Sequence, residues 1–244
     1  MGKLENQTAL VTGAGRGIGA AIAQAFAREG ARIAVTDIDL DSATATQETL
    51  PTDGLALRMD VSSQADVRAG FGQAINQMGH LDILVNNAGY IAFCTYDDCT
   101  EELWDRTINI NLKGTYLCTQ AALAHMKERR SGQIVSMTSM AAKTGGLTVG
   151  PPYAASKGGI FSMIIGMARE GAPFGIRANG IAPGVIDTEM TRAPQYDDNL
   201  TTQIPLGEKG QPEDVAACAL FLVSDDSRHI TGEIVDVNGG LFMD

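Results

Sequence analysis

Apolar and polar positions alternate along this chain in blocks that predict short strands separated by helices. Between the strands lie alanine-rich or amphipathic stretches typical of helices, which reach to about Gly30, from Ser62 or Ser63 to about Met78, and from Thr100 to about Arg129. Five apolar runs read as strands: Thr8–Val11, Arg32–Asp37, Gly54–Val61, Leu81–Gly89 and Gln133–Ser139. Because strands that are apolar on both faces and alternate with helices form parallel sheets covered on both sides, we predict a single doubly wound α/β domain.

A glycine-rich turn follows the first predicted strand. Four alternate glycines, Gly13 to Gly19, stand between the apolar run and the helix-like Ala20–Phe26. A strand, turn and helix start of this kind expose backbone N–H groups and a helix dipole that can hold a pyrophosphate, and a Cβ there would block the phosphates. Counted from Gly13 the G-x-G-x-x-G pattern fails at Ile18, whereas from Gly15 it fits with Ala20 last. An ordinary glycine turn is the alternative to this nucleotide loop.

Polar residues stand at the carboxyl ends of the next predicted strands, where open α/β sheets bind their ligands. Asp37 falls about 20 residues beyond the glycines, where an acid can accept hydrogen bonds from an adenosine ribose. The alternative is that Asp37 only caps the following helix, but Asp39 and Asp41 are free to do that. Asp60 and Asn87 end the third and fourth strands.

The long helical stretch is interrupted at Asn109–Gly114, where two Asn and a Gly are poor helix formers. The interruption is either a loose junction between two helices or a kink at Asn111 whose carbonyl binds water in a site. Sequence leaves both open.

Tyr153 and Lys157 are four residues apart, so on a helix opening at Tyr153 they share one face. A phenol with a pKa near 10 is a poor base at neutral pH, but a nearby ammonium favours the phenolate. A hydroxyl such as that of Ser139 could hold the substrate oxygen and share its developing charge. These groups could move a proton while a hydride moves to a nicotinamide ring.

Along essentially its whole length the chain resembles the short-chain dehydrogenase/reductase family. The matching motifs are Thr12-Gly13-x-x-x-Gly17-x-Gly19, Asn86–Gly89, Asn111, Ser139, Tyr153-x-x-x-Lys157, Pro183–Thr188 and Thr231–Gly240. The resemblance implies a Rossmann-like, mostly parallel seven-stranded sheet and a proton-relaying tetrad of Asn111, Ser139, Tyr153 and Lys157, with Tyr153 as acid/base. It also implies that the cofactor is bound by Gly13, Arg16, Gly17, Ile18, Gly19, Asp37, Asp60, Val61, Asn87, Tyr153, Lys157, Ile186 and Thr188.

Two segments depart from the family pattern. Met140–Pro152 is slightly longer than expected, which makes Thr138 an alternative to Ser139 as the hydroxyl in the site. The segment at about residues 188–211, which forms a substrate lobe in the family, is short and polar here and favours a small hydroxylated substrate. Its polar residues could equally well only face water.

Composition narrows the function further. The net charge of −11 argues against nucleic acid and anionic membranes, and no apolar run approaches the length of a membrane span. Cys94, Cys99, Cys118 and Cys218 show neither metal-ligand nor disulfide spacing, so we expect no metal and a reduced cytoplasmic location. His80, His125 and His229 lie outside every motif and are expected to be surface or packing residues.

We therefore predict an NAD-dependent oxidoreductase that interconverts a secondary alcohol and a ketone on a small polar substrate, such as a polyol or sugar. By the family resemblance it would be a homotetramer, with the long helices Glu101–Arg129 and Tyr153–Gly171 at subunit interfaces. The rival enzyme is an NADPH-dependent 3-oxoacyl thioester reductase, for which Arg16 could neutralise the ribose phosphate. A catalytically silent NAD-sensing regulator is the rival from another class, but it would not need the complete tetrad.

Overall fold

The computed structural model describes residues 2–192 and 198–243. The strands are β1 (Thr8–Thr12), β2 (Arg32–Asp37), β3 (Leu55–Arg58), β4 (Ile83–Asn86), β5 (Gly132–Met137), β6 (Ile176–Pro183) and β7 (Ile234–Val237). The α-helices are α1 (Gly17–Arg28), α2 (Leu40–Glu48), α3 (Gln64–Met78), α4 (Glu101–Ile108), α5 (Gly114–Arg129), α6 (Ala141–Thr144), α7 (Pro151–Gly171) and α8 (Pro212–Val223). Short 3-10 turns occur at Ala172–Phe174, Asp198–Gln203 and Asp225–Ser227.

The described strands form one parallel sheet of seven, in the order β3-β2-β1-β4-β5-β6-β7. The order reverses direction between β1 and β4, which is the topological switch point where such sheets bind ligands. The prediction of a doubly wound α/β domain is confirmed, and the sheet is wholly parallel.

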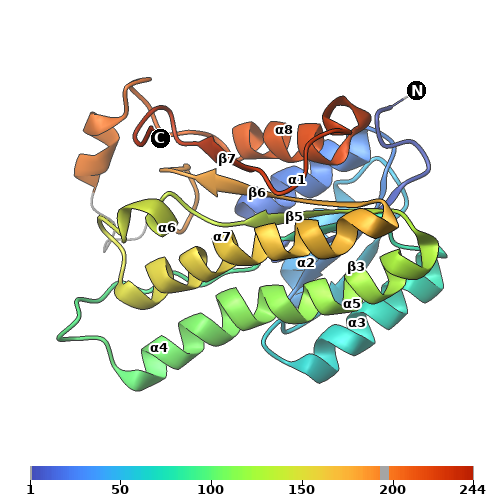
Figure 1. Ribbon diagram of the computed structural model, residues 1–244, viewed down its shortest axis with the longest axis horizontal. Coiled ribbons are helices and arrows are strands. Elements are labelled where there is room, and N and C mark those ends of the chain that lie inside the picture. The colour runs from blue at the N-terminus through green and yellow to red at the C-terminus, as the bar shows by residue number, and fades with distance from the viewer. Residues whose placement is uncertain (1, 193–197, 244) are drawn as a thin grey trace.

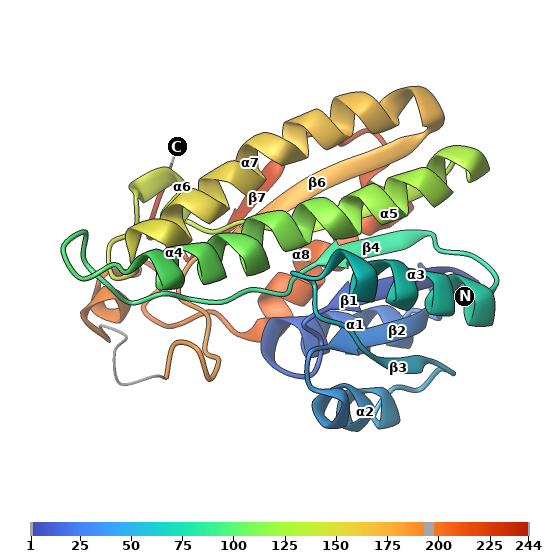
Figure 2. The same cartoon turned by 90° about the horizontal axis from the view of Figure 1, so that it is seen from below.

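Two hydrophobic layers enclose the sheet. On one face α1 and α8 pack around Ile22, Phe26 and Leu222, and on the other α3, α5 and α7 pack around Phe71, Met126 and Met167. Figures 1 and 2 show these two groups of helices on opposite sides of the strands. The strands β1 and β4 are buried along their whole length, which explains why their sequences are apolar without alternation.

Helix α7 begins two residues before the predicted start at Tyr153. Pro151 and Pro152 occupy its first turn, where a missing N–H costs nothing because it has no intrahelical partner. The prolines therefore open the helix that carries Tyr153 and Lys157.

The interruption predicted within residues 100–129 is a π-helical turn, Asn109–Lys113, between α4 and α5. The helix continues from α4 through this turn into α5 without a break. The carbonyl of Asn111 accepts a hydrogen bond from the Thr115 hydroxyl at 2.7 Å, and the side chain of Asn111 is fully buried. Single π-helical turns of this kind commonly mark functional sites.

Strand β6 carries polar residues that hide it from a hydrophobic pattern. The guanidinium of Arg177 donates to the carbonyls of Leu222 and Ser224, at 2.8 and 3.0 Å. The amide of Asn179 donates to the Ile230 carbonyl at 3.0 Å. These side chains tie the sheet to the last turn of α8 and the segment after it, and their hydrogen bonds compensate for their burial.

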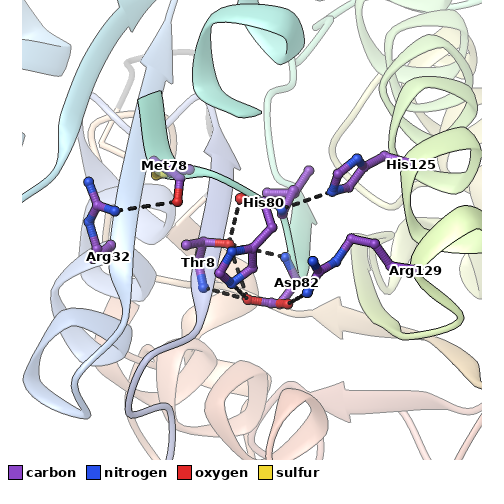
Figure 3. A network of polar contacts seen from close by, with 8 residues as sticks. Thr8, Arg32, Met78, His80, Asp82, His125 and Arg129 are labelled. Atoms are coloured by element: carbon purple, nitrogen blue, oxygen red, sulfur yellow. Dashed lines mark hydrogen bonds and ion pairs between the residues drawn. The ribbon is translucent and has the colours of Figure 1, made fainter. Parts of the chain in front are cut away.

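A polar network joins the amino-terminal ends of β1 and β4, at the opposite end of the strands from the glycine loop (Figure 3). The carboxylate of Asp82 accepts from the backbone N–H of Thr8 at 2.9 Å and from Arg129 at 3.2 Å, and lies 2.9 Å from Nε2 of His80. Nε2 of His125 accepts the backbone N–H of Leu81 at 3.2 Å, which requires a neutral ring. His80 and His125 thus hold β1, β4 and α5 together, whereas His229 is exposed.

His125 makes the stability of the protein depend on pH. Burial and the neighbouring Arg129 lower the pKa of His125, against opposing effects of Glu128 and Asp82. Because the pKa of His125 is lower in the folded than in the unfolded protein, the stabilisation by the neutral ring is complete above about pH 6.5. It is lost as the pH falls further. When the pH is lowered from about 7.5 to about 5.5, the free energy of unfolding measured with urea should fall by up to about 1 kcal/mol in wild type. The same fall should be absent in His125→Gln. Equal losses in the two proteins would contradict this role for His125.

Candidate active site

The glycine loop between β1 and α1 has the shape needed for a phosphate. Gly13 and Gly17 have φ of 61° and 56°, which L side chains rarely adopt, and a Cβ on Gly13 would lie 2.7 Å from the Cα of Ala88. Arg16 at the N-cap makes no side-chain capping bond, and the first turn of α1 carries no acidic residue. The N–H groups at this helix start therefore suit an anion such as a pyrophosphate.

Asn87 ties the end of β4 to this loop. Its side-chain amide donates to the carbonyls of Thr12 and Gly13, at 3.0 and 2.9 Å. The Thr12 hydroxyl in turn accepts the backbone N–H groups of Asn87 and Ala88, each at 3.0 Å. A Cβ on Gly19 would collide with the Gly13 carbonyl and lie 2.5 Å from the Asn87 amide nitrogen. Thr12 is a residue whose positioning role was not predicted.

Asp37 faces the glycine loop from the end of β2. Its Oδ2 accepts the backbone N–H of Gly15 at 3.0 Å, and it does not cap the next helix. Asp39 fills that role, since its side chain accepts the N–H of Asp41 at the start of α2. The helix-cap alternative for Asp37 is therefore wrong.

Arg16 extends from the loop toward the segment that follows β6. Its guanidinium lies 2.8 Å from the carboxylate of Glu189, and both side chains are well exposed. Nearby, Thr188 approaches the loop, because a Cβ on Gly17 would lie 3.6 Å from Cγ2 of Thr188. Ile186 is buried, and its carbonyl accepts the Thr191 hydroxyl at 2.6 Å.

Asp60 and Val61 lie just past β3, at the same edge of the sheet. The Asp60 carboxylate accepts the N–H and hydroxyl of Ser62, at 2.9 and 2.7 Å, and so shapes the turn into α3. Val61 is buried against the start of α5, where a Cβ on Gly114 would lie 2.8 Å from Cγ2 of Val61. An adenine ring could contact this turn only from its exposed side.

Asn111 holds the loop after β4 against α7. Its Oδ1 accepts the backbone N–H of Tyr90 at 2.7 Å, and its Nδ2 donates to the Tyr90 carbonyl and to the Ser156 hydroxyl, each at 3.0 Å. Ser156 donates to the carbonyl of Tyr153 at 2.7 Å. The π-helical turn thus places Asn111 where it fixes the backbone next to Tyr153.

Two hydroxyls follow β5, and their bonding differs. The Thr138 hydroxyl is buried and donates to the carbonyl of Lys157 at 2.9 Å. Ser139 is partly exposed, and its Oγ accepts the N–H of Ala141 at 3.1 Å. Because a hydroxyl that accepts still carries one proton to donate, Ser139 rather than Thr138 suits a substrate oxygen.

Lys157 is buried beside Tyr153. Its Nζ donates to the carbonyl of Met137 at 2.8 Å and lies 5.7 Å from the centre of the Tyr153 ring. A Cβ on Gly89 would lie within 4 Å of both the Lys157 Nζ and the Asn111 Oδ1. Burial lowers the pKa of Lys157 to about 8, because desolvation disfavours the ammonium.

Comparison with known proteins shows which family the chain belongs to. A sequence model described as enoyl-(acyl carrier protein) reductase matches residues 13–242. An uncharacterized oxidoreductase of Mycobacterium bovis is 42% identical over 98% of both chains. The chain belongs to the short-chain dehydrogenase/reductase family. It is an oxidoreductase of that type.

Two further relatives agree with this family assignment. The 3-oxoacyl-[acyl-carrier-protein] reductase of Thermotoga maritima is 38% identical over 99% of this chain and 100% of that protein. A short-chain type dehydrogenase/reductase of Mycobacterium marinum has a TM-score of 0.95 at 31% identity, with 99% of this chain and 97% of that chain covered. The fold and the reaction class follow from the family, whereas the substrate does not.

The remaining expectations concern metals and membranes. Within residues 2–192 and 198–243, no group of three or more His, Cys, Asp and Glu side chains is placed to hold a metal ion. None of the described helices has both the length and the apolar character needed to cross a membrane. The cysteines Cys94, Cys99, Cys118 and Cys218 are free thiols.

The buried ammonium of Lys157 should govern the pH dependence of turnover. Alcohol oxidation should speed up from neutral to alkaline pH, because the active base is the phenolate of Tyr153, which the charged Lys157 favours up to its own pKa of about 8. Lys157→Ala removes the charge, so its profile of kcat/KM should move to higher pH and its cofactor affinity should fall. Lys127→Ala, at an exposed pair with Glu170, is the matched control. An unmoved profile in Lys157→Ala would exclude an electrostatic role.

Proposed function

We propose that this oxidoreductase transfers a hydride between NAD and a small polar secondary alcohol, which it interconverts with the ketone. The observation that carries the proposal is the buried Lys157, whose Nζ lies 5.7 Å from the Tyr153 ring centre on the same helix face. A buried cation beside a phenol has little structural benefit of its own, because its desolvation is costly. It suits a phenol that must lose and regain a proton.

Each residue has its own role in the proposed reaction. Ser139 donates a hydrogen bond to the substrate oxygen, and Tyr153 takes the hydroxyl proton in oxidation or returns it in reduction. Lys157 favours the phenolate form of Tyr153 and is itself oriented by the Met137 carbonyl. Asn111 fixes the backbone of Tyr90 and α7 around them. A bound nicotinamide supplies the acceptor or donor of the hydride.

The cofactor would be bound by the glycine loop and the strand ends around it. Gly13, Gly17, Ile18 and Gly19 would receive the pyrophosphate at the start of α1, and Asp37 the adenosine ribose. Asp60 and Val61 would border the adenine, and Asn87, Ile186 and Thr188 the nicotinamide half.

Two charges support NAD over NADP. Asp37 would face a 2′-phosphate as a like charge, which is repulsive in a partly desolvated pocket. Arg16, the guanidinium that could offset this repulsion, lies 2.8 Å from Glu189. An interaction of an exposed guanidinium is worth only about 1 kcal/mol or less, so Arg16 cannot outweigh the repulsion from Asp37.

The lobe after β6 supports a small polar substrate. Thr188, Glu189 and Thr191 are polar, and the buried apolar residues Leu200 and Ile204 pack inward on Val185. The part of the lobe at residues 193–197 lies outside the described residues. A 3-oxoacyl thioester is the second candidate, because the Thermotoga maritima relative is named for that reaction.

We also infer a homotetramer in the cytoplasm. Trp104 and Tyr116 on the long α4–α5 helix are 41% and 50% exposed. Such exposed aromatic side chains are typical of subunit interfaces.

A cofactor-linked screen tests the proposed reaction. Purified protein is offered NAD with polyols, sugars, hydroxy acids and cyclic alcohols, and NADPH with a 3-oxoacyl thioester, while nicotinamide absorbance is followed. Oxidation of a polyol or sugar with NAD is expected. Turnover of the thioester alone would replace the proposed substrate with the second candidate, and a protein inert in every arm would favour a sensor.

Tyr153→Phe should abolish turnover but leave cofactor binding largely intact, because the ring remains and only the proton donor is lost. The loss in kcat should reach at least roughly 10²-fold to 10⁴-fold, the usual range for general acid–base catalysis. Tyr96→Phe, at a tyrosine whose side chain is 87% exposed, is the matched control. More than about a tenth of the wild-type rate in Tyr153→Phe would remove this phenol from the mechanism.

Steady-state kinetics with both cofactors tests the role of Asp37. In wild type, kcat/KM should favour NAD over NADP by roughly 10²-fold or more, since each tenfold corresponds to about 1.4 kcal/mol. Asp37→Ala should narrow this ratio mainly by improving NADP. Asp39→Ala, which removes the helix cap instead, should leave the ratio unchanged. A wild-type preference for NADP would overturn the NAD assignment.

A further inference from the structure

An ion pair that is mostly buried joins α6 to β7 beside the candidate active site. Nζ of Lys143 lies 2.6 Å from Oδ2 of Asp236, and the two side chains are only 11% and 21% exposed. The same Nζ lies 5.6 Å from the centre of the Phe242 ring. The pair therefore connects a four-residue helix after β5 with the last strand and the segment that follows it.

The burial of this pair makes the Asp236 carboxylate depend on Lys143. The second carboxylate oxygen of Asp236, Oδ1, is buried and has no hydrogen-bond partner among the described residues. Removing one member of a buried ion pair leaves an uncompensated charge, whereas an intact pair contributes little net stability. Its effect is geometric: Lys143 can satisfy Asp236 only while α6 stays in its present place.

Helix α6 in turn determines the bonding of Ser139. The N–H of Ala141 donates to Oγ of Ser139 at 3.1 Å, and the N–H of Ala142 donates to its carbonyl at 2.9 Å. On either side, Thr138 and Met140 donate their N–H groups to the carbonyls of β6 residues. The backbone around Ser139 is thus fixed by β6, and its hydroxyl is oriented by α6.

Glycines end α6 after a single turn. Gly145 and Gly146 follow it directly, both with positive φ, and the next side chain, Leu147, is 58% exposed. A helix of a single turn is not stable by itself and needs tertiary contacts. Lys143 supplies such a contact on the side of β7, and packing on α7 supplies the other.

We propose that Lys143 and Asp236 are positioning residues for the reaction. They hold α6 so that the Ala141 N–H occupies a lone pair of Ser139 and directs its proton to the substrate oxygen. The inference rests on the proposed function, in which Ser139 binds that oxygen. It adds to the tetrad a pair of residues that touches neither substrate nor cofactor.

A double-substitution cycle separates positioning from general stability. Asp236→Asn, which keeps the shape of the side chain, should lower kcat/KM on the best substrate by about tenfold through loss of Ser139 orientation. In a Ser139→Ala background the same substitution should change kcat/KM by less than about twofold, because no hydroxyl remains to orient. NADH affinity should be unchanged in both backgrounds. Asp226→Asn, at the equally short but exposed Lys3–Asp226 pair, is the matched control and should be silent.

The outcomes are distinguishable. The positioning role would be overturned if the losses in kcat/KM caused by Asp236→Asn and Ser139→Ala multiplied in the double variant. It would also be overturned if Asp236→Asn alone kept the wild-type kcat/KM. If Asp236→Asn does not fold, Lys143→Gln takes its place in the same cycle, with the same criteria. Wild-type turnover in Ser139→Ala would instead refute the role of Ser139 in the proposed function and with it the basis of this inference.

Discussion

The site depends first on the pairing of β1 with β4, where the order of strands reverses. Hydrogen bonds between Thr12 and the Asn87 segment join these two strand ends, and the Asn87 amide also binds the Gly13 carbonyl. This contact sets the distance between the glycine loop and the loop that Asn111 holds. Since parallel strands end at one edge, groups far apart in sequence are then brought together at that edge of the sheet.

The second constraint is the burial of a cation. Lys157 is 4% exposed, and its hydrogen bond to the Met137 carbonyl fixes its direction without neutralising its charge. The cost of desolvation lowers its pKa to about 8, so the ammonium is poised close to working pH. Thr138, Asn111 and Ser156 secure the surrounding backbone, and in the proposed mechanism Tyr153 and Ser139 are the residues that face the substrate.

Much of the architecture could be predicted from sequence because it depends on local signals. The apolar runs predicted β1, β2 and β4, and the glycine spacing predicted the loop before α1. Strand β6 was missed because Arg177 and Asn179 interrupt its apolar pattern, and their compensating partners lie about 50 residues away. The π-helical turn could not be predicted either, because its stability comes from the contact of Asn111 with Tyr90.

In the candidate site, too, sequence motifs identify single residues but not the contacts between segments that are far apart in the sequence. Motif spacing selected Asp37, Tyr153 and Lys157, but no spacing rule links Arg16 to Glu189 or Lys143 to Asp236. The role of His125 as an acceptor likewise depends on a fold contact, to the N–H of Leu81. Ion pairs and hydrogen bonds between distant segments need the tertiary structure, because sequence separation carries no information on them.

Binding of NADH, followed by nicotinamide fluorescence, tests whether a dinucleotide binds at the switch point. Wild type should bind NADH saturably, and Gly19→Val should lose this binding because the new side chain would collide with the Gly13 carbonyl and the Asn87 amide. Gly72→Ala, at a glycine with open space around it, is the control and should bind as wild type does. Absence of NADH binding to the folded wild-type protein, or equal binding by Gly19→Val, would contradict a dinucleotide site at the switch point.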